Sequence, residues 1–250
     1  MRQFDVLIIG AGAVGNAIAR EISKKNTVTA GVLEKEPDTA FGISGRNSGV
    51  LHAGFNNKPG SFMSKLCVQG SEGFEKEAEE LKLPFKKTGK LIIARYEEDL
   101  ERLQKLKEQG EANGVRELRI IDREELQKMA GYEAGAGALW SGMTGIFDPF
   151  QYTIALAEAA AARGAEYFFG RQVTGIAPHV ENQVEQGNTL SGKGFLVTAE
   201  NLSNGRKELY QADVLINSAG LFADEICRMA GIHDYVIYPC RGEYHILDKK

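Results

Sequence analysis

The sequence has little cysteine, no surplus of positive charge and no long apolar run. Its 3 cysteines, Cys67, Cys227 and Cys240, form no Cys-x-x-Cys or Cys/His cluster, which predicts a reducing compartment, no disulfide framework and no metal site. Lys and Arg total 30 against 34 Asp and Glu, so a nucleic-acid partner is not expected. No apolar stretch approaches the roughly 20 residues that cross a bilayer. These absences predict a cytoplasmic protein, with association to a membrane surface left open.

Proline is also scarce, whereas glycine is abundant. The 250 residues include 29 glycines but only 6 prolines. Disordered or collagen-like chains would show more proline or a repeat, and this sequence has neither. We therefore expect the glycines to occupy particular turns of a folded protein. Its length suits one large domain or two interleaved ones.

The N-terminal residues predict a βαβ unit. Residues 5–10 form a short apolar run that ends in glycine, as in a buried parallel strand. Residues 15–24 have helical apolar spacing, and residues 27–34 predict a second strand. A strand, a glycine turn, a helix and a strand make one such unit.

A Gly-x-Gly-x-x-Gly motif lies at the first turn of this unit. Gly10 permits a tight turn, Gly12 lets the backbone approach a pyrophosphate, and Gly15 lets the helix pack closely on the strand. Alone this motif is a weak signal, because a glycine turn can also occur without any ligand. Its position after a predicted strand and before a predicted helix favours dinucleotide binding.

The surroundings of the motif favour a phosphate and a ribose. Backbone N–H groups near Ala13 and Val14, together with the helix dipole, favour a bound phosphate. Glu34 ends the second predicted strand and can accept hydrogen bonds from ribose hydroxyls. The motif does not by itself distinguish NAD from FAD.

The rest of the chain shows mixed helix and strand patterns. Asp148, Pro149 and Gln151 resemble an N-terminal capping box, which predicts a helix to Arg163. Further helices are predicted at 62–81, 97–113, 122–130 and 221–230, strands at 89–95, 166–176, 194–199, 208–210, 213–217 and 235–247, and an ordered loop at 37–62.

The segment from Ser44 to Gly54 carries a resemblance to a known family. It resembles the loop after the second strand in the FAD-dependent D-amino-acid-oxidase-like superfamily, with the nearest likeness to L-2-hydroxyglutarate oxidases and FAD-dependent glycerol-3-phosphate dehydrogenases. Asp148-Pro149-Phe150 looks more like the glycerol-phosphate enzymes, and Arg241-Gly242-Glu243-Tyr244 more like the hydroxyglutarate enzymes. Further matches in the family's order are Pro59-Gly60-Ser61, Gly89-Lys90-Leu91, Asn217-Ser218-Ala219-Gly220-Leu221 and Pro239-Cys240.

The resemblance implies a fold and a domain layout. We expect an α/β protein with a Rossmann-like FAD-binding domain that has a parallel sheet, and an inserted substrate domain with a mixed or antiparallel sheet. The FAD-binding domain would comprise residues 1–80 and 148–230, and the substrate domain residues 81–147. Residues 231–250 would begin the return to the substrate domain. Because members of the family continue well past this point, we expect the chain to be a fragment of a longer flavoprotein with an incomplete flavin pocket.

The resemblance also assigns cofactor roles to individual residues. Val173 matches the residue whose backbone contacts adenine, and Ala219 and Gly220 lie near the ribityl and phosphate region. Residues matching Arg46, Asn47, Ser48 and Gly49 wrap the FAD diphosphate and approach the flavin. The alternatives are purely structural roles: a core position for Val173 and a turn at a helix start for Ala219-Gly220.

Three residues are candidates for catalysis. His52 lies in the expected flavin loop and could contact the flavin, act as a general base, link covalently to the flavin, or only shape the loop. Arg241 could clamp a carboxylate or phosphate with its guanidinium fork, or form a surface salt bridge. Tyr244 lies on the same predicted strand, which lines the substrate cavity in relatives.

The predicted function is an FAD-dependent oxidoreductase acting on a small anionic hydroxy compound, such as glycerol 3-phosphate or L-2-hydroxyglutarate. Hydride would go to flavin N5, with the protein supplying orientation and charge. One alternative is an amine oxidase of the amino-acid or sarcosine type, and another is a non-catalytic FAD-binding subunit. The electron acceptor (oxygen, a quinone or a redox protein) is left open.

Overall fold

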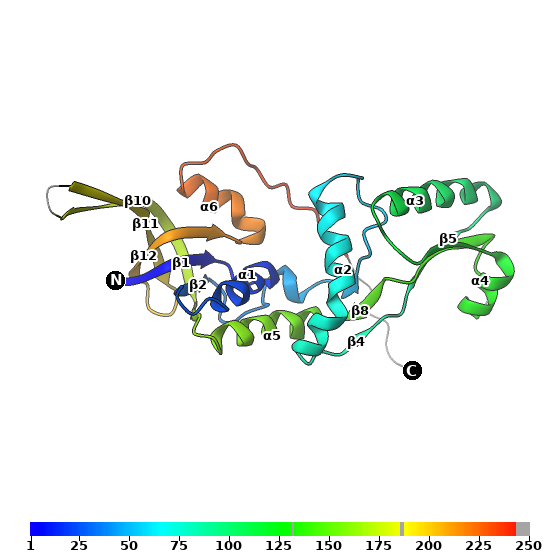
Figure 1. Ribbon diagram of the computed structural model, residues 1–250, viewed down its shortest axis with the longest axis horizontal. Helices are drawn as coiled ribbons and strands as arrows, with labels where there is room; N and C mark the ends of the chain where they lie inside the picture. Colours follow the sequence, from blue (N-terminus) through cyan, green and yellow to red (C-terminus); the bar gives the residue numbers. More distant parts are fainter. Residues whose placement is uncertain (132, 186–187, 244–250) are drawn as a thin grey trace. The chain divides into compact units, whose positions relative to one another are not determined.

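The computed structural model describes residues 1–131, 133–185 and 188–243, except the side chains of residues 180–193. The chain divides into two compact units. The first unit contains residues 1–48 and the chain from Pro149 onward, and the second unit contains Gly49–Asp148 (Figure 1). The second unit is therefore an insertion between two halves of the first.

A six-stranded mixed sheet forms the centre of the first unit, in the order β10-β11-β12-β1-β2-β9. Strands β12, β1, β2 and β9 are parallel neighbours, whereas β10, β11 and β12 are antiparallel neighbours. The strands are β1 (Arg2–Ile9), β2 (Ala30–Glu34), β9 (Glu166–Phe169), β10 (Arg171–Glu185), β11 (Asn188–Asn201) and β12 (Arg206–Asn217). This arrangement confirms the predicted α/β class, but the sheet is mixed and not parallel throughout as predicted, because β10, β11 and β12 pair antiparallel.

Two helices pack on one face of this sheet. They are α1 (Ala13–Ser23) and α5 (Pro149–Ala161). Ala19 of α1 and Ala160 of α5 are fully buried in one cluster with apolar side chains of β1 and β2. The small side chains let the helices approach the sheet and each other closely.

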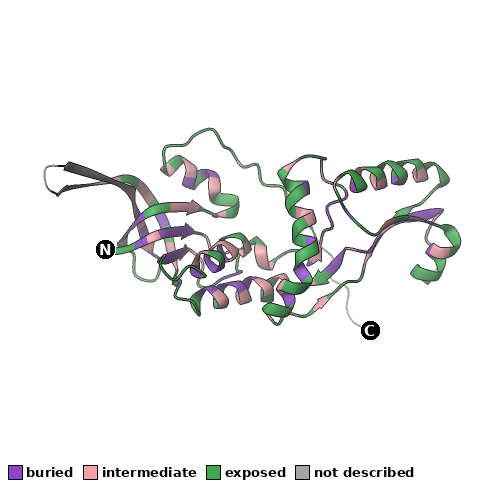
Figure 2. Ribbon diagram, viewed as in Figure 1, coloured by how far each residue is buried: buried purple, intermediate pink, exposed green. Residues whose placement is uncertain are grey.

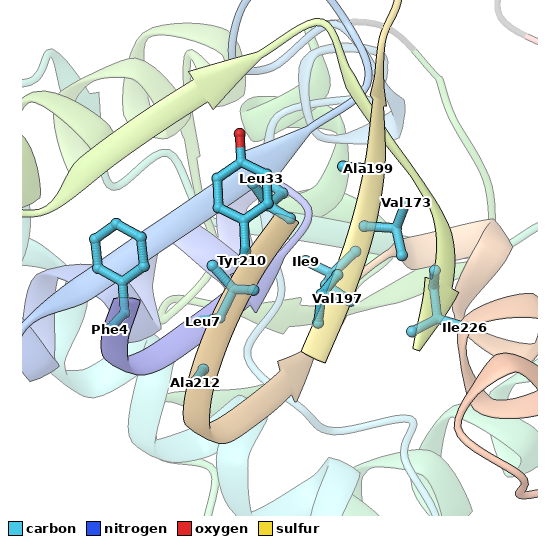
Figure 3. Packing of buried hydrophobic residues seen from close by; sticks show 10 residues of the cluster. All are labelled: Phe4, Leu7, Ile9, Leu33, Val173, Val197, Ala199, Tyr210, Ala212 and Ile226. Carbon is cyan, nitrogen blue, oxygen red and sulfur yellow. The ribbon is translucent and has the colours of Figure 1, made fainter. Parts of the chain in front are cut away.

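The opposite face is covered by α6 (Ala223–Met229), whose Ile226 joins a second apolar cluster. Figure 3 shows this cluster, which contains Phe4, Leu7, Ile9, Leu33, Val173, Val197, Ala199, Tyr210, Ala212 and Ile226. Because the two clusters bury alternate side chains of β1 on both faces, this strand is buried along most of its length (Figure 2). Burial on both faces explains why its sequence is a continuous apolar run.

The second unit contains two three-stranded antiparallel sheets. The first has the order β3-β8-β4 and the second has the order β5-β7-β6. The elements are β3 (Val50–Leu51), α2 (Phe62–Glu80), β4 (Phe85–Lys86), β5 (Lys90–Ala94), α3 (Leu100–Ala112), β6 (Leu118–Asp122), α4 (Arg123–Ala130), β7 (Gly137–Ser141) and β8 (Gly145–Phe147). Antiparallel strands agree with the sheet predicted for the insertion.

Helices α3 and α4 each bury an apolar side chain against the β5-β7-β6 sheet. Leu103 of α3 packs with Ala94 and Leu139, and Leu126 of α4 lies in a separate cluster with Ile121. Because the partners of the two helices alternate along the strands, the helices lie on opposite faces of the sheet. Helix, sheet and helix form a small layered core inside the second unit.

The compact units differ from the predicted domains at two places: at the first boundary, and at residues 231–243, which belong to the first unit and not to a return to the substrate domain. The expected first boundary follows residue 80, whereas the structure divides the chain between Ser48 and Gly49. The segment after Gly49 pairs and packs inside the second unit: Val50 pairs with Ile146, and Ser71 of α2 donates to the Met143 carbonyl at 3.0 Å. The second boundary, at Asp148, lies next to the expected one.

Several strand predictions need correction. The strand predicted at 166–176 is two strands, β9 and β10, because Gly170 has a φ of +65° and turns the chain between them. The two strands predicted at 208–210 and 213–217 form the single strand β12, which pairs with β11 along its first half and with β1 further on. Strands β4, β6, β7 and β8, and the short β3 within the loop predicted at 37–62, are not among the predicted strands.

The strand predicted at 235–247 is wrong over its described part. Residues 235–243 have no strand, and no strand of the described chain pairs with them. Tyr235, Val236 and Tyr238 are exposed. A segment with strand-forming residues forms a strand only where another strand supplies hydrogen-bond partners. Residues 244–247 lie outside the described residues.

Candidate functional site

A cleft of about 510 Å³ opens at the carboxyl ends of β1, β2 and β12 in the first unit. Ligands of open α/β sheets bind outside the carboxyl ends of the parallel strands. The segments that line the cleft are residues 9–14, 33–36, 40–44 and 46, 171–173, 218–222, and Glu225, Ile226 and Met229. The dinucleotide motif therefore lies in the wall of a cavity.

The turn at the end of β1 requires glycine. Gly10 has a φ of +104°, and a Cβ added there would lie 2.5 Å from the Ser218 carbonyl oxygen. A Cβ on Gly15 would lie 2.0 Å from the Gly10 carbonyl oxygen. The Ser218 hydroxyl donates to the Ile9 carbonyl at 2.9 Å and ties the ends of β1 and β12 together. A close backbone approach therefore explains both glycines.

Helix α1 begins at the cleft, and its N-cap residue does not cap its first N–H groups with a side chain. Its N-cap residue is Gly12, which has no side chain to accept from the first N–H groups. The Ala13 N–H donates instead to the Ser44 hydroxyl at 2.9 Å. Val14 is 66% exposed beside it. Helix N-termini of this kind favour an anion.

The Glu34 carboxylate lies at the end of β2 on the cleft wall. One oxygen accepts from the Ala11 N–H at 2.7 Å, and the other accepts from the Glu36 N–H at 3.0 Å. Each carboxylate oxygen keeps a further lone pair for a hydroxyl donor. Beside it, the Lys35 ammonium lies 3.5 Å from the centre of the Phe222 ring, a cation–π contact between two segments of the cleft wall.

The part of the wall contributed by β10 is held by a polar network. Arg171 donates to both oxygens of Glu208, at 3.3 and 3.1 Å, and the Tyr210 hydroxyl donates to Glu208 at 2.6 Å. Hydrogen bonds from Tyr210 and Arg171 lower the pKa of Glu208 to about 2. Burial, and then the hydrogen bond to Glu208, raises the pKa of Tyr210 to about 12. The network fixes the first residues of β10. One of them, Val173, contributes to both the core and the cleft.

The segment after Ser44 contains one residue that lines the cleft and others that lie outside its lining. Arg46 lines the cleft, and its guanidinium donates to the Phe41 carbonyl. The Asn47 side chain instead donates to the Ser44 carbonyl at 2.9 Å and stabilises the short helix η1 (Ile43–Gly45). Ser48 is exposed, and neither Asn47 nor Ser48 is part of the cleft lining.

The structure thus brings most predicted cofactor residues to one cavity. Those that line it are Gly10, Gly12, Ala13, Val14, Glu34, Arg46, Val173, Ala219 and Gly220. Gly15 lies behind the lining, where it permits the packing of α1 on β1. Asn47 and Ser48 lie outside the lining, and Gly49 belongs to the second unit.

Sequence reasoning missed Ser44, Arg171 and Ser218 as members of this cavity. Ser44 and Ser218 lie within segments that carried the family resemblance, so the resemblance could have assigned them to the cofactor site. Arg171 had no such signal, because its place depends on Glu208 across the sheet.

His52 lies in the second unit, in a loop whose carbonyls accept hydrogen bonds from side chains. Partial burial, and then the charge of Lys90, lowers the pKa of His52, so its imidazole is neutral near pH 7. Burial raises the pKa of the Cys67 thiol, and this protonated thiol donates to the His52 carbonyl at 3.2 Å. His52 is thus an exposed residue with a neutral imidazole on a fixed backbone.

Two side chains at the end of α3 hold the rest of the loop. Asn113 donates to the Gly54 carbonyl at 3.0 Å and to the Asn57 carbonyl at 2.8 Å. Gln109 donates to the Phe55 carbonyl at 3.2 Å. Beneath them the Phe55 side chain is buried in an apolar cluster. We call residues 52–57 the His52 loop.

The two remaining catalytic candidates do not form a site in the described residues. Arg241 lies in a segment without secondary structure, has an 86% exposed side chain, and pairs with Glu243 at 3.1 Å. This contact matches the surface salt bridge that was the alternative to a substrate clamp. Tyr244 lies outside the described residues. Within the described ranges, no group of three His, Cys, Asp or Glu side chains could hold a metal ion, and no helix is long and apolar enough to cross a membrane.

Comparison with known proteins places these features in context. Residues 5–250 match the model of a family described as "FAD dependent oxidoreductase". The chain is 37% identical over 248 residues to a glycerol 3-phosphate dehydrogenase of Caloramator mitchellensis, covering 98% of this chain and 48% of that protein. It is 35% identical to the mitochondrial L-2-hydroxyglutarate dehydrogenase of Homo sapiens, covering 98% of this chain and 52% of that protein. The chain therefore spans about half the length of these relatives.

Solved structures agree with the fold. An L-alpha-glycerophosphate oxidase from Mycoplasma pneumoniae, solved with FAD bound, superposes with a TM-score of 0.79 and 26% identity, over 92% of this chain and 57% of that one. A glycine oxidase from Geobacillus kaustophilus superposes with a TM-score of 0.76, over 92% of this chain and 59% of that one, but at 22% identity this likeness concerns the fold alone.

Proposed function

Because the chain belongs to the family of FAD-dependent oxidoreductases, we propose that the cleft of its first unit holds FAD and that the protein oxidises a small anionic hydroxy compound. The observation that carries the proposal is the cleft itself. A glycine turn, a helix start with glycine as its N-cap residue, and a strand-end carboxylate line one cavity of about 510 Å³. The relatives' names, which include glycerol 3-phosphate and L-2-hydroxyglutarate dehydrogenases, support the substrate class.

The residues of the cleft fit the dinucleotide. Gly10 permits the turn, Gly12 would let the backbone approach a pyrophosphate, and N–H groups at the start of α1 would donate to its oxygens. Glu34 would accept from ribose hydroxyls. Val173 would offer backbone contacts to adenine. Arg46, with its permanent charge, would face the diphosphate.

Further contacts follow from the same proposal. Ala219 and Gly220 would approach the ribityl and phosphate region from the end of β12. Asn47, Ser48 and Gly49 would wrap the diphosphate, although all three lie outside the cleft lining. Arg241 and Tyr244 remain predictions as substrate contacts. When bound, FAD supplies the acceptor for the hydride removed from the substrate carbon.

His52 would take the proton of the substrate hydroxyl. A neutral imidazole can accept a proton, and the lowered pKa of His52 keeps it neutral near pH 7. The Cys67 and Asn113 hydrogen bonds to the His52 loop would keep the imidazole in place while the proton moves. The resulting imidazolium would return its proton to water before the next cycle.

A reconstitution experiment tests this function. The protein is loaded with FAD, and its visible spectrum is recorded without oxygen while L-2-hydroxyglutarate, glycerol 3-phosphate or amino acids are added. Bleaching by a hydroxy compound supports the proposal, and bleaching by an amine supports an amine oxidase. No bleaching by any compound supports a non-catalytic FAD-binding subunit. A protein that never acquires flavin absorbance contradicts the cofactor site.

Reoxidation of the reduced flavin identifies the class of electron acceptor. Oxygen, a soluble quinone and a redox protein are added in turn, and the return of the oxidised spectrum is timed. The acceptor that restores it fastest is the physiological class. The predicted cytoplasmic location is checked by fractionating cells and following the protein in the soluble and membrane fractions.

A further inference from the structure

Lys90 is a half-buried cation at the start of β5 in the second unit. Its ammonium lies 5.8 Å from the centre of the Phe55 ring. In the described part of the chain no carboxylate lies within ion-pair distance of it, whereas the nearby Lys87 pairs with Glu117 at 2.9 Å. A partly desolvated ammonium without a carboxylate partner favours an anion from outside the chain.

The Lys90 ammonium belongs to the surroundings of His52. It contacts the ring of Phe55, a member of the His52 loop whose carbonyl is held by Gln109. After burial, the positive charge of Lys90 is the second cause that lowers the pKa of His52. Strand β5 pairs with β7, and the Gly89 N–H donates to the Thr144 carbonyl at 2.8 Å, so the start of β5 is fixed. A cation and a neutral base therefore lie near each other on rigid backbone.

We propose that the Lys90 ammonium binds the carboxylate or phosphate of the hydroxy substrate whose hydroxyl faces His52. This inference rests on the proposed function and names the residue that would select its anionic substrates. An ammonium is a compact charge with three donors, so it accepts either kind of anion without the fixed geometry that a guanidinium imposes.

Anion binding at Lys90 has a consequence for His52. The charge of Lys90 is one of the two causes that lower the pKa of the imidazole, and the other is burial. A bound anion offsets that charge, so the pKa of His52 rises when substrate is present. The base then binds the hydroxyl proton more strongly in the complex than in the free protein.

Kinetics of the FAD-loaded protein test the proposal. We expect Lys90→Met to raise the KM for anionic hydroxy substrates about 10- to 100-fold, because a charge-assisted hydrogen bond is lost. Lys90→Arg should restore most of the affinity. Lys86→Met is the matched control, since Lys86 is exposed on β4 of the same unit and should leave KM unchanged. Comparing the KM change for L-2-hydroxyglutarate with that for glycerol 3-phosphate distinguishes a carboxylate from a phosphate.

An NMR titration of His52 gives a second readout that needs no turnover. The His52 signal is assigned with His52→Gln, and its pKa is followed while inorganic phosphate or glutarate is added. In the unaltered protein the pKa should rise on addition. In Lys90→Met it should start higher and not respond.

The outcomes separate the two proposals. If no hydroxy compound reduces the flavin but phosphate still shifts His52 through Lys90, the proposed function fails and the anion site stands. If a hydroxy compound reduces the flavin and Lys90→Met behaves as Lys86→Met in both measurements, the anion site fails.

Discussion

The two units build their candidate sites in different ways. In the first unit the cleft is shaped by backbone: a glycine turn, a helix start and the ends of parallel strands. In the second unit the His52 loop is held by side chains, since Cys67, Gln109 and Asn113 all donate to its carbonyls. Backbone conformation depends on neighbouring residues in the sequence. The side chains that hold the His52 loop come from up to 59 positions away along the chain, as with Asn113 and Gly54.

This difference predicts different responses to mutation. A change in the first unit should act through steric exclusion and through the strands, and affect the folding of the whole unit. A change in the second unit should loosen the loop while its sheets remain folded, because the β5-β7-β6 core has its own apolar clusters.

Gly10→Val should have the largest effect. The new side chain meets the Ser218 carbonyl, and the φ of +104° is strained for any residue with a Cβ. We expect a loss of about 3–5 kcal/mol in the free energy of unfolding, measured by urea denaturation, and no FAD binding. Gly73→Ala on α2 is the contrast: nothing lies within 4 Å of its added Cβ, so a gain of about 0.5–1 kcal/mol is expected. Equal stability of Gly10→Val and the unaltered chain would contradict the steric account.

Glu208→Gln should rank second and depend on pH. The pKa of Glu208 is lowered from 4.5 to about 2 in the folded state, so the carboxylate stabilises the fold above pH 4.5 and this stabilisation is lost as pH falls toward 2. We expect Gln to cost about 2 kcal/mol at pH 7, because hydrogen bonds to a charged group are replaced by weaker ones.

Urea denaturation at pH 7, 4 and 3 measures this effect. The difference between the two proteins should shrink as the pH is lowered through that window. Glu166→Gln is the control, because its pairing with Arg2 at 3.2 Å is at the surface. A difference that is the same at pH 7 and pH 3 would show that the Glu208 charge contributes nothing.

Asn113→Ala should have a smaller, local effect. It removes both hydrogen bonds to the His52 loop, at a cost of about 1–2 kcal/mol. Hydrogen exchange of the amides in residues 54–57 should accelerate, and turnover should fall, while exchange in β7 stays unchanged. The control is Gln104→Ala, because the Gln104 side chain donates to exposed Glu108 on the same helix. Acceleration throughout the second unit would mean that the loop and the sheets unfold together.

Lys128→Ala should have the smallest effect. Lys128 pairs with Glu124 at 2.8 Å, but both side chains are more than 70% exposed. Such a pair contributes less than about 0.5 kcal/mol, so thermal unfolding should hardly change. A loss above about 1 kcal/mol would show that this exposed pair is not screened by solvent as expected.

The sequence predicted the first unit better than the second. The βαβ unit, helix α5 and the glycine turn were readable because each depends on neighbouring residues: a continuous apolar run, a proline at the helix start, a glycine at the turn. Strands β6, β7 and β8 were missed because their residues gain partners only in the tertiary structure: β7 lies between β5 and β6, and β8 lies between β3 and β4. The segment 235–243 shows the opposite error, a strand-like pattern without a partner strand.

The sequence by itself determined where the backbone must turn and approach closely. Gly10, Gly12 and Gly15, with Glu34 at the end of the next strand, specified the cleft because backbone conformation is a local property. Only the tertiary structure decided that Asn113 holds the His52 loop and that Lys90 lies near His52. Contacts between distant side chains arise when sheets and helices pack, and neither composition nor spacing encodes which of the many lysines will lie beside the one histidine of that loop.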